Sequence, residues 1–244
     1  MSPGRVARVT AFKILVGALL IVPLRFPVFA RALAIPFTLY VILDSVWLFQ
    51  PALDFYQRFR WLMFPLWQLT ELALYTVSAV VIHRIVLLGA ASVPRYGVGW
   101  TRHTTIFFTF LLVLTSLSYA VAVAVSRSFE GAGGFLLLIA FILVWLGWAF
   151  GIARLLLVFP AAAVGEPITL TDSWNLTHDR KALMCLVAIV YPIFVDLPTR
   201  LIPESSTIGY LMRSLSSLLA LTITVILLSF AYQQILKERA SSRR

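Results

Sequence analysis

The sequence predicts an all-α fold, a polytopic membrane bundle of six transmembrane helices. Of its 244 residues, 61% are hydrophobic and only 12% are charged, and the mean hydropathy is +0.94. Soluble domains carry about 25% charged residues, so this chain has about half the charge that a water-facing surface needs. The apolar stretches run continuously for about 20 residues, which indicates helices rather than the alternating strands of a barrel. With one cysteine, a disulfide scaffold is excluded as well.

Six apolar segments are long enough to cross a bilayer, which requires about 20 residues. They are residues 29–49, 61–85, 104–125, 134–159, 182–201 and 215–232. The fifth segment is the weakest, because Pro192, Asp196 and Pro198 interrupt it. No polar connection is long enough for a soluble domain, so residues 1–244 are expected to form a single integral membrane domain.

A shorter apolar block precedes the spans at residues 12–24. It is too short to cross the bilayer, so we expect an interfacial helix over about residues 10–24 on the inner membrane surface. A short re-entrant segment is the alternative. A signal peptide is a third interpretation, and Arg25 and Arg31 around the required cleavage site argue against it.

The positive charges predict the orientation, because cytoplasmic loops retain Lys and Arg. With both termini in the cytoplasm and six spans, 15 of the 20 Lys and Arg residues lie inside. If residues 12–24 also crossed, only 12 would lie inside. The bias therefore favours six spans, and it explains the net charge of +10 without a nucleic-acid partner. The five outer residues are Arg58, Arg60, Arg127, Arg200 and Arg213.

The longer inner loop contains a helix signal between residues 160 and 181. Thr169 is followed three residues later by Asp172, the spacing of a capping box. Leu170 and Trp174 lie four residues apart and share one face of the resulting helix. We expect a second interfacial helix over about residues 170–178.

One segment resembles a known membrane family. "RLLLVFPAAAVGEPITLTDSWNLT", from Arg154 to Thr177, is similar to a segment of uncharacterised bacterial multi-pass inner-membrane proteins, and to the membrane domain that accompanies glycerophosphodiester phosphodiesterases. "HRIVLLG", from His83 to Gly89, looks like a second signature. The sequence departs from that pattern at His178 and Asp179. The resemblance implies six helices and an envelope setting. It does not imply phosphodiesterase chemistry, because the catalytic domain of those enzymes does not accompany the segment.

Three acids fall inside the spans, where an unpaired charge costs at least a few kcal/mol. Glu71, Asp44 and Asp196 all fall in the outer half, with Arg200 and Arg213 above them. They are candidates for binding an ion or a substrate in a cavity open to the outside. The alternative is structural: Glu71 pairs with a hydroxyl or guanidinium between helices, and the other two acids reach water.

Four residues near the inner ends are candidates for binding a lipid head group: Arg154, Arg84, His83 and Trp174. Arginine offers two parallel hydrogen bonds to a phosphate. The alternative is that these side chains anchor the helix ends by reaching to the interface. Gly147 and Gly151 form a GxxxG motif, for which packing inside the bundle is favoured over dimerisation.

Cofactor and metal sites are not expected. His83, His103 and His178 lack the spacing of metal ligands, and no phosphate-binding loop or nucleophile motif is present. No residue is a catalytic candidate.

The leading hypothesis is a non-enzymatic protein of the bacterial inner membrane that interacts with lipids, anionic ones included, or with an envelope partner or a second copy of itself. The alternatives are a small-solute or proton-coupled transporter or permease component using Glu71, and a membrane-embedded lipid-modifying enzyme.

Overall fold

The computed structural model describes residues 3–46, 54, 56–97, 99–128, 135–203 and 206–241. All regular elements in these ranges are helices, and six are long and apolar enough to cross a membrane. The predicted all-α membrane fold with six spans is therefore confirmed. Residues 47–49, the end of the first predicted span, and residue 134, the start of the fourth, lie outside the described residues. The six helical segments that are long and apolar enough to cross a membrane are Phe26–Ser45, Arg60–Leu88, Arg102–Arg127, Ile139–Val164, His178–Arg200 and Thr207–Ser241.

The first two helices are joined by a single residue. Helix α1 covers Pro3–Leu24, helix α2 covers Phe26–Ser45, and the chain bends at Arg25. One face of α1 is buried through Ala11, Ile14 and Ala18, and this helix contacts α11. The opposite side of this helix does not pack against the bundle, since Phe12 is 62% exposed. Its placement on the inner membrane surface stays a prediction.

Helix α4 covers Arg60–Leu88 and ends at Gly89, which leads into the short 3₁₀ helix η2 at Ala90–Ser92. The loop that follows passes very close to α2. Gly97 has a φ of +64°, and a Cβ atom built there would lie 2.0 Å from the carbonyl oxygen of Ala32. Only glycine has both the backbone freedom and the small size for this approach.

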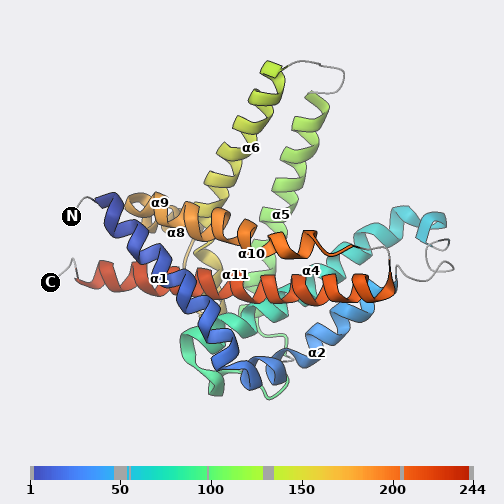
Figure 1. Cartoon of the computed structure of the whole chain (residues 1–244), viewed down its shortest axis with the longest axis horizontal. Helices are drawn as coiled ribbons and strands as arrows, with labels where there is room; N and C mark the ends of the chain where they lie inside the picture. Colours follow the sequence, from blue (N-terminus) through green and yellow to red (C-terminus); the bar gives the residue numbers. More distant parts are fainter. Residues whose placement is uncertain are drawn as a thin grey trace.

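Helices α5 (Arg102–Ser128) and α6 (Phe135–Leu155) project away from the other helices (Figure 1). The indole Nε1 of Trp148 donates a hydrogen bond of 3.3 Å to the Ser118 hydroxyl, which ties the two helices together. No described heavy atom lies within 4 Å of a Cβ built on Gly147 or Gly151. The internal packing predicted at this GxxxG motif is thus not made by the described residues.

The predicted span 134–159 is broken near its inner end. Helix α6 stops at Leu155, and α7 runs from Val158 to Val164. Pro160 has no N–H group, so the helix loses a hydrogen bond at this point. Helix α8 then covers Leu170–Leu176, and its capping box is formed as the sequence predicts.

The weak span predicted at 182–201 is also irregular. It consists of the 3₁₀ turn η3 (His178–Arg180), α9 (Lys181–Cys185), the π-helical turn η4 (Leu186–Val190) and α10 (Tyr191–Arg200). The π turn ends two residues before Pro192, where the helix must adjust to a missing N–H group and a bulky ring. The chain therefore crosses as a helix despite its prolines.

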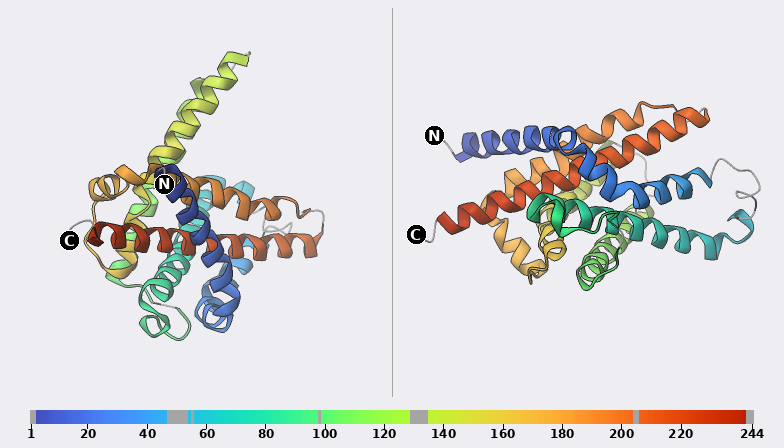
Figure 2. Two further views of the ribbon diagram at one scale, coloured as in Figure 1. Left: turned by 60° about the vertical axis from the view of Figure 1, so that its left-hand side comes forward. Right: turned by 90° about the horizontal axis from the view of Figure 1, so that it is seen from below.

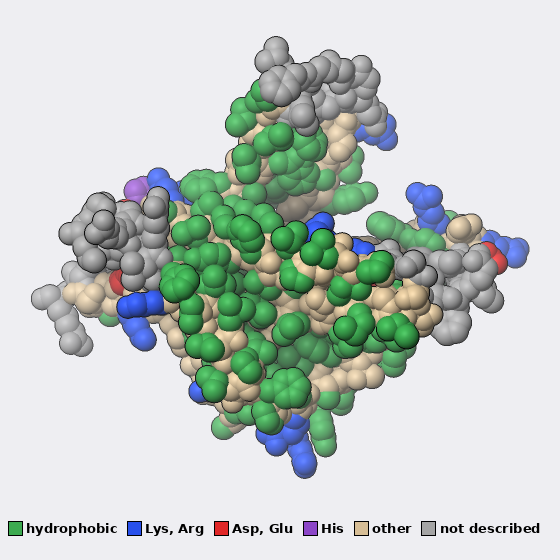
Figure 3. All heavy atoms as spheres, viewed as in Figure 1, with side chains coloured by type: hydrophobic (Ala, Val, Ile, Leu, Met, Phe, Trp, Pro, Cys, Tyr) green, Lys and Arg blue, Asp and Glu red, His purple; other side chains and the backbone are tan. Residues whose placement is uncertain are grey.

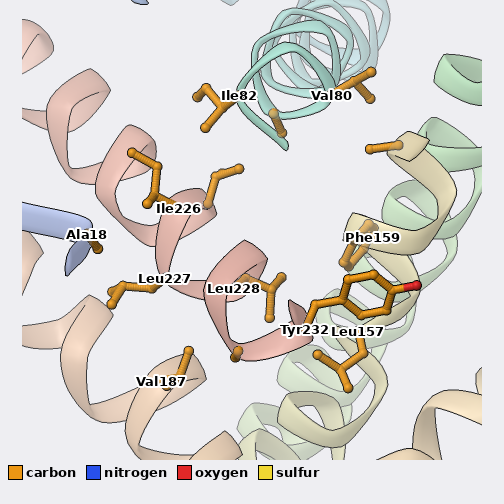
Figure 4. Packing of buried hydrophobic residues seen from close by; sticks show 14 of the residues in the cluster. Ala18, Val80, Ile82, Leu157, Phe159, Val187, Ile226, Leu227, Leu228 and Tyr232 are labelled. Carbon is orange, nitrogen blue, oxygen red and sulfur yellow. The ribbon is translucent and has the colours of Figure 1, made fainter. Parts of the chain in front are cut away.

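Helix α11 (Thr207–Ser241) is the centre of the bundle and runs along its long axis (Figure 1). At 1.5 Å per residue its 35 residues span about 52 Å, more than the roughly 30 Å of hydrocarbon in a bilayer. Two rotated views show α10 lying along it and α1 crossing it, and α4 contacts it as well (Figure 2). Its side chains meet those of four neighbouring segments (Figure 4). The close-up labels Ile226, Leu227, Leu228 and Tyr232 of α11 with Ala18, Val80, Ile82, Leu157, Phe159 and Val187.

The surface is apolar, as expected for a protein surrounded by lipid. Hydrophobic side chains cover most of the face in Figure 3, with charged side chains mainly at its margins. Large apolar residues such as Leu24 and Trp61 are both 78% exposed. Such exposure is costly in water and favourable in hydrocarbon.

Replacing Gly97 with alanine is expected to destabilise the protein by about 1–2 kcal/mol from the left-handed backbone alone, with a further cost from the clash with Ala32. The measurement is thermal unfolding in detergent. Gly99→Ala is the matched control, because the nearest atom to its added Cβ is 4.0 Å away. Equal melting temperatures for the two variants would contradict this account.

Candidate functional site

A cluster of polar side chains joins α2, α4 and α11 toward the predicted outer ends of these spans. Asp44 lies in the last turn of α2, and Tyr210 and Ser214 lie one turn apart near the start of α11. The Tyr210 hydroxyl lies 2.8 Å from the carbonyl oxygen of Asp44 and 2.9 Å from its Oδ1. The Ser214 hydroxyl donates to Oδ2 of Asp44. Both carboxylate oxygens of Asp44 therefore have partners on α11.

Glu71, on α4, contacts the same cluster through Tyr40. Tyr40 lies one helical turn before Asp44, and its hydroxyl reaches Oε1 of Glu71 at 3.5 Å, a long hydrogen bond. Glu71 is half-buried, and its Oε2 accepts no hydrogen bond from the described residues. Unlike Asp44, this carboxylate has unused capacity to accept hydrogen bonds.

A cavity of about 210 Å³ adjoins these groups. Each water molecule occupies about 30 Å³ in the liquid, so the cavity has room for a small solute. Glu71 does not line it directly, but lies behind the Tyr40 hydroxyl. The lining residues are Tyr40, Asp44, Tyr210, Arg213, Ser214 and Ser217.

Asp196, the third predicted acid, lies outside this cluster. Its Oδ2 accepts a hydrogen bond of 2.9 Å from Nε of Arg200, four residues later on α10. Its Oδ1 accepts another of 2.8 Å from the Thr199 hydroxyl. The structure thus brings two of the three predicted acids together and pairs the third locally.

The sequence did not single out the hydroxyl groups of the cluster. Tyr210, Ser214 and Ser217 follow a helical spacing in α11, and Tyr40 and Asp44 lie four residues apart in α2. This spacing places each set on one helix face. A search for polar residues at helical spacing within apolar segments would have found them.

At the opposite end, Arg154 is buried, with only 4% of the residue exposed. Its guanidinium donates to the carbonyl oxygen of Trp174 at 2.7 Å and to the Thr177 hydroxyl at 3.3 Å, and its centre lies 3.6 Å from the centroid of the Trp174 ring. In return, the Ser173 hydroxyl donates to the carbonyl oxygen of Arg154 at 2.8 Å. These contacts hold α8 against the end of α6, where the chain leaves that helix before α7 begins.

The other two head-group candidates also bind protein groups. Arg84 is half-buried and donates to the carbonyl oxygens of Ser92, at 3.2 Å, and Ala163, at 3.3 Å. His83 is buried, with Nδ1 lying 2.7 Å from the Ser229 hydroxyl. Among the described residues, no group of three His, Cys, Asp or Glu side chains lies close enough to hold a metal ion.

Comparisons of this chain with protein-family models, with curated proteins and with solved structures found no match. The similarity of residues 154–177 to the membrane domain of glycerophosphodiester phosphodiesterases stays a prediction.

Replacing Arg154 with lysine is expected to destabilise the protein by about 2 kcal/mol, because an ammonium group keeps the charge but loses the planar stacking and the paired hydrogen bonds. Thermal unfolding in detergent measures the loss. Arg31→Lys, at an exposed position of α2, is the control and leaves the melting temperature unchanged. A combined Arg154→Lys and Trp174→Leu variant that loses the sum of both single effects would show that the two side chains do not interact.

Acid is expected to loosen the start of α8. The hydroxyl and the backbone N–H of Thr169 donate to Asp172 and hold the pKa of its carboxyl below the usual range. This stabilisation is fully present above the unfolded pKa near 3.9 and is lost as the pH falls through the lower folded pKa. Protection of α8 amides from hydrogen exchange, corrected for intrinsic rates, should therefore stay constant from about pH 7 to pH 5 and decrease below about pH 4. An Asp172→Asn variant with the same acid response would contradict this assignment.

Proposed function

We propose that this protein binds a small polar solute in the cavity between α2 and α11 and is a component of a proton-coupled transporter or permease that uses Glu71. The observation that carries the proposal is the state of the Glu71 carboxylate. It lies within a membrane-spanning helix beside a polar cavity, with one long hydrogen bond and a second oxygen that the described residues leave open. An intramembrane carboxylate is costly, so such a residue is a functional candidate by default.

Asp44 has a different part in this proposal. Its two oxygens accept hydrogen bonds from Tyr210 and Ser214, so it orients the hydroxyl groups of α11. The bound solute would meet these hydroxyls and the guanidinium of Arg213, which also lines the cavity. In this proposal Glu71 exchanges a proton through the Tyr40 hydroxyl, which lies 3.5 Å from its Oε1.

The hypotheses of a lipid-interacting protein and of a lipid-modifying enzyme receive less support from the candidate residues predicted from the sequence. Arg154, Arg84 and His83 direct polar atoms to carbonyl or hydroxyl groups of the protein, which favours structural roles over binding a head group. A lipid-modifying enzyme requires a cluster of reactive groups. The hydrogen bonds of Glu71, Asp44 and Asp196 to described residues join none of these acids to another.

The proposal includes the setting, a bacterial inner membrane with both termini in the cytoplasm. The distribution of Lys and Arg supports this orientation. The start of α1 and the end of α11 lie at the same end of the molecule (Figure 1), as an even number of spans requires. A side-specific reporter fused to each terminus tests it, and termini on opposite faces would overturn it.

Glu71→Gln is expected to abolish solute-dependent proton movement while leaving the protein folded. The assay uses liposomes that contain the purified protein and an internal pH-sensitive dye, with an imposed membrane potential and a panel of amino acids, polyamines and sugars. At least one solute should speed proton entry by about tenfold or more through the wild-type protein, which corresponds to ~1.4 kcal/mol.

Asp196→Asn is the matched control, because it removes an acid in the outer half that lies outside the cluster. It should keep the transport rate. The proposal fails if no solute moves protons through the wild-type protein, or if Glu71→Gln moves them equally well. A large drop in the melting temperature of Glu71→Gln would instead identify a structural acid.

A further inference from the structure

A second groove, of about 460 Å³, lies at the other end of the spans between α5, α7 and the loop that leads to α8. Its polar lining consists mainly of Arg102, His103 and Glu166. Neither Arg102 nor Glu166 is among the site residues predicted from the sequence. The groove is separate from the cavity beside Glu71 and shares no lining residue with it.

The groove is polar at one end and apolar along its length. Arg102 is the first residue of α5, and Ile106 and Phe110 follow it at four-residue intervals on the same helix face. Phe110 therefore lies about 12 Å deeper along the helix axis than Arg102. Because α5 is a membrane-spanning helix that begins at Arg102, the polar end lies near the interface and the apolar part extends into the hydrocarbon.

The local backbone shapes the polar end. Gly165 ends α7 with a φ of +83°, and a Cβ atom built there would lie 2.6 Å from Cε1 of His103. Glycine thus lets the His103 ring lie directly against the loop. The next residue, Glu166, is exposed, and its Oε2 accepts a hydrogen bond from the Tyr232 hydroxyl of α11. This bond holds the carboxylate at the groove and leaves Oε1 available.

Arg102 and Glu166 carry opposite charges in one groove without neutralising each other. Arg102 is exposed, and neither residue forms an ion pair with a described residue. A ligand with one negative and one positive group would complement both. The apolar wall below them, which includes Ala162 and Ile168, complements a hydrocarbon chain.

We propose that this groove binds one phospholipid with a zwitterionic, ethanolamine-type head group. Its phosphate lies against Arg102, whose planar fork can donate two parallel hydrogen bonds, and against the His103 ring. Its ammonium group lies against Oε1 of Glu166. One acyl chain follows Ile106 and Phe110 along α5. An anionic lipid without an ammonium group would leave Glu166 unpaired next to a phosphate, which the like charges disfavour.

The test measures the lipid bound to the full-length protein. The wild-type protein and each variant are placed in nanodiscs of equal parts phosphatidylethanolamine and phosphatidylglycerol, extracted in mild detergent, and analysed by native mass spectrometry. The wild-type chain should retain one phosphatidylethanolamine, with an enrichment over phosphatidylglycerol of about tenfold, or ~1.4 kcal/mol.

The variants separate the two charges. Arg102→Gln should lose the retained phospholipid of either type. Glu166→Gln keeps an acceptor for Tyr232 and should reverse the preference in favour of phosphatidylglycerol. Arg95→Gln, an exposed arginine in the loop before α5, is the control and should keep the wild-type pattern.

Three results would overturn the proposal. The first is a wild-type lipid composition equal to that of the nanodisc, which would indicate no selective site. The second is an equal loss of lipid in Arg102→Gln and Arg95→Gln, which would indicate general attraction to the membrane surface. The third is an unchanged preference in Glu166→Gln. None of them affects the proposed transport function, which rests on the other cavity.

Discussion

The packing of the other helices around α11 is the constraint on which both candidate sites depend. This helix contacts α1, α2, α4, α7 and α10, and its middle carries fully buried side chains such as Ile226 and Leu227. Its N-terminal part supplies the hydroxyls of Tyr210 and Ser214 to the outer cluster. Tyr232, 22 residues after Tyr210, holds Glu166 at the groove beside Arg102. At 1.5 Å per residue this is about 33 Å, close to the thickness of the hydrocarbon layer.

Hydrocarbon offers no partner to a buried polar group, and several buried polar side chains among the described residues find their partners within the chain. Thr76, Ser78, Thr222 and Ser229 donate their hydroxyls to carbonyl groups one turn earlier in their own helices. Arg154 instead exchanges hydrogen bonds with α8, across the break in its own helix. The second oxygen of the half-buried Glu71 accepts no hydrogen bond from the described residues, and this open oxygen is the reason for proposing a function for that residue.

Helices α5 and α6 project away from the rest of the bundle (Figure 1). Most of the surface of α5 is exposed. Only 11% of the residues in its most apolar stretch are buried. Its first turns nevertheless rest against α7, through the ring contact of Phe107 and Phe159 at 4.8 Å. The groove beside Arg102 is lined by these first turns of α5.

The sequence by itself determined the features that depend on local composition and spacing. Six helices cross because each apolar run is long enough, and hydropathy is a property of the run alone. The capping box at Thr169 and Asp172 formed because its hydrogen bonds join residues three apart. The pairing of Asp196 with Arg200 has the same origin, since four residues make one helical turn.

Only the tertiary structure decided which distant residues meet. Asp44 and Tyr210 are 166 positions apart, and Tyr232 and Glu166 are 66 apart, so no local pattern links them. The burial of Arg154 depended on where α8 folds back, which the length of an apolar segment does not specify. Hydrophobicity determines that a helix enters the membrane, whereas side-chain packing between helices determines its neighbours and hence its chemistry.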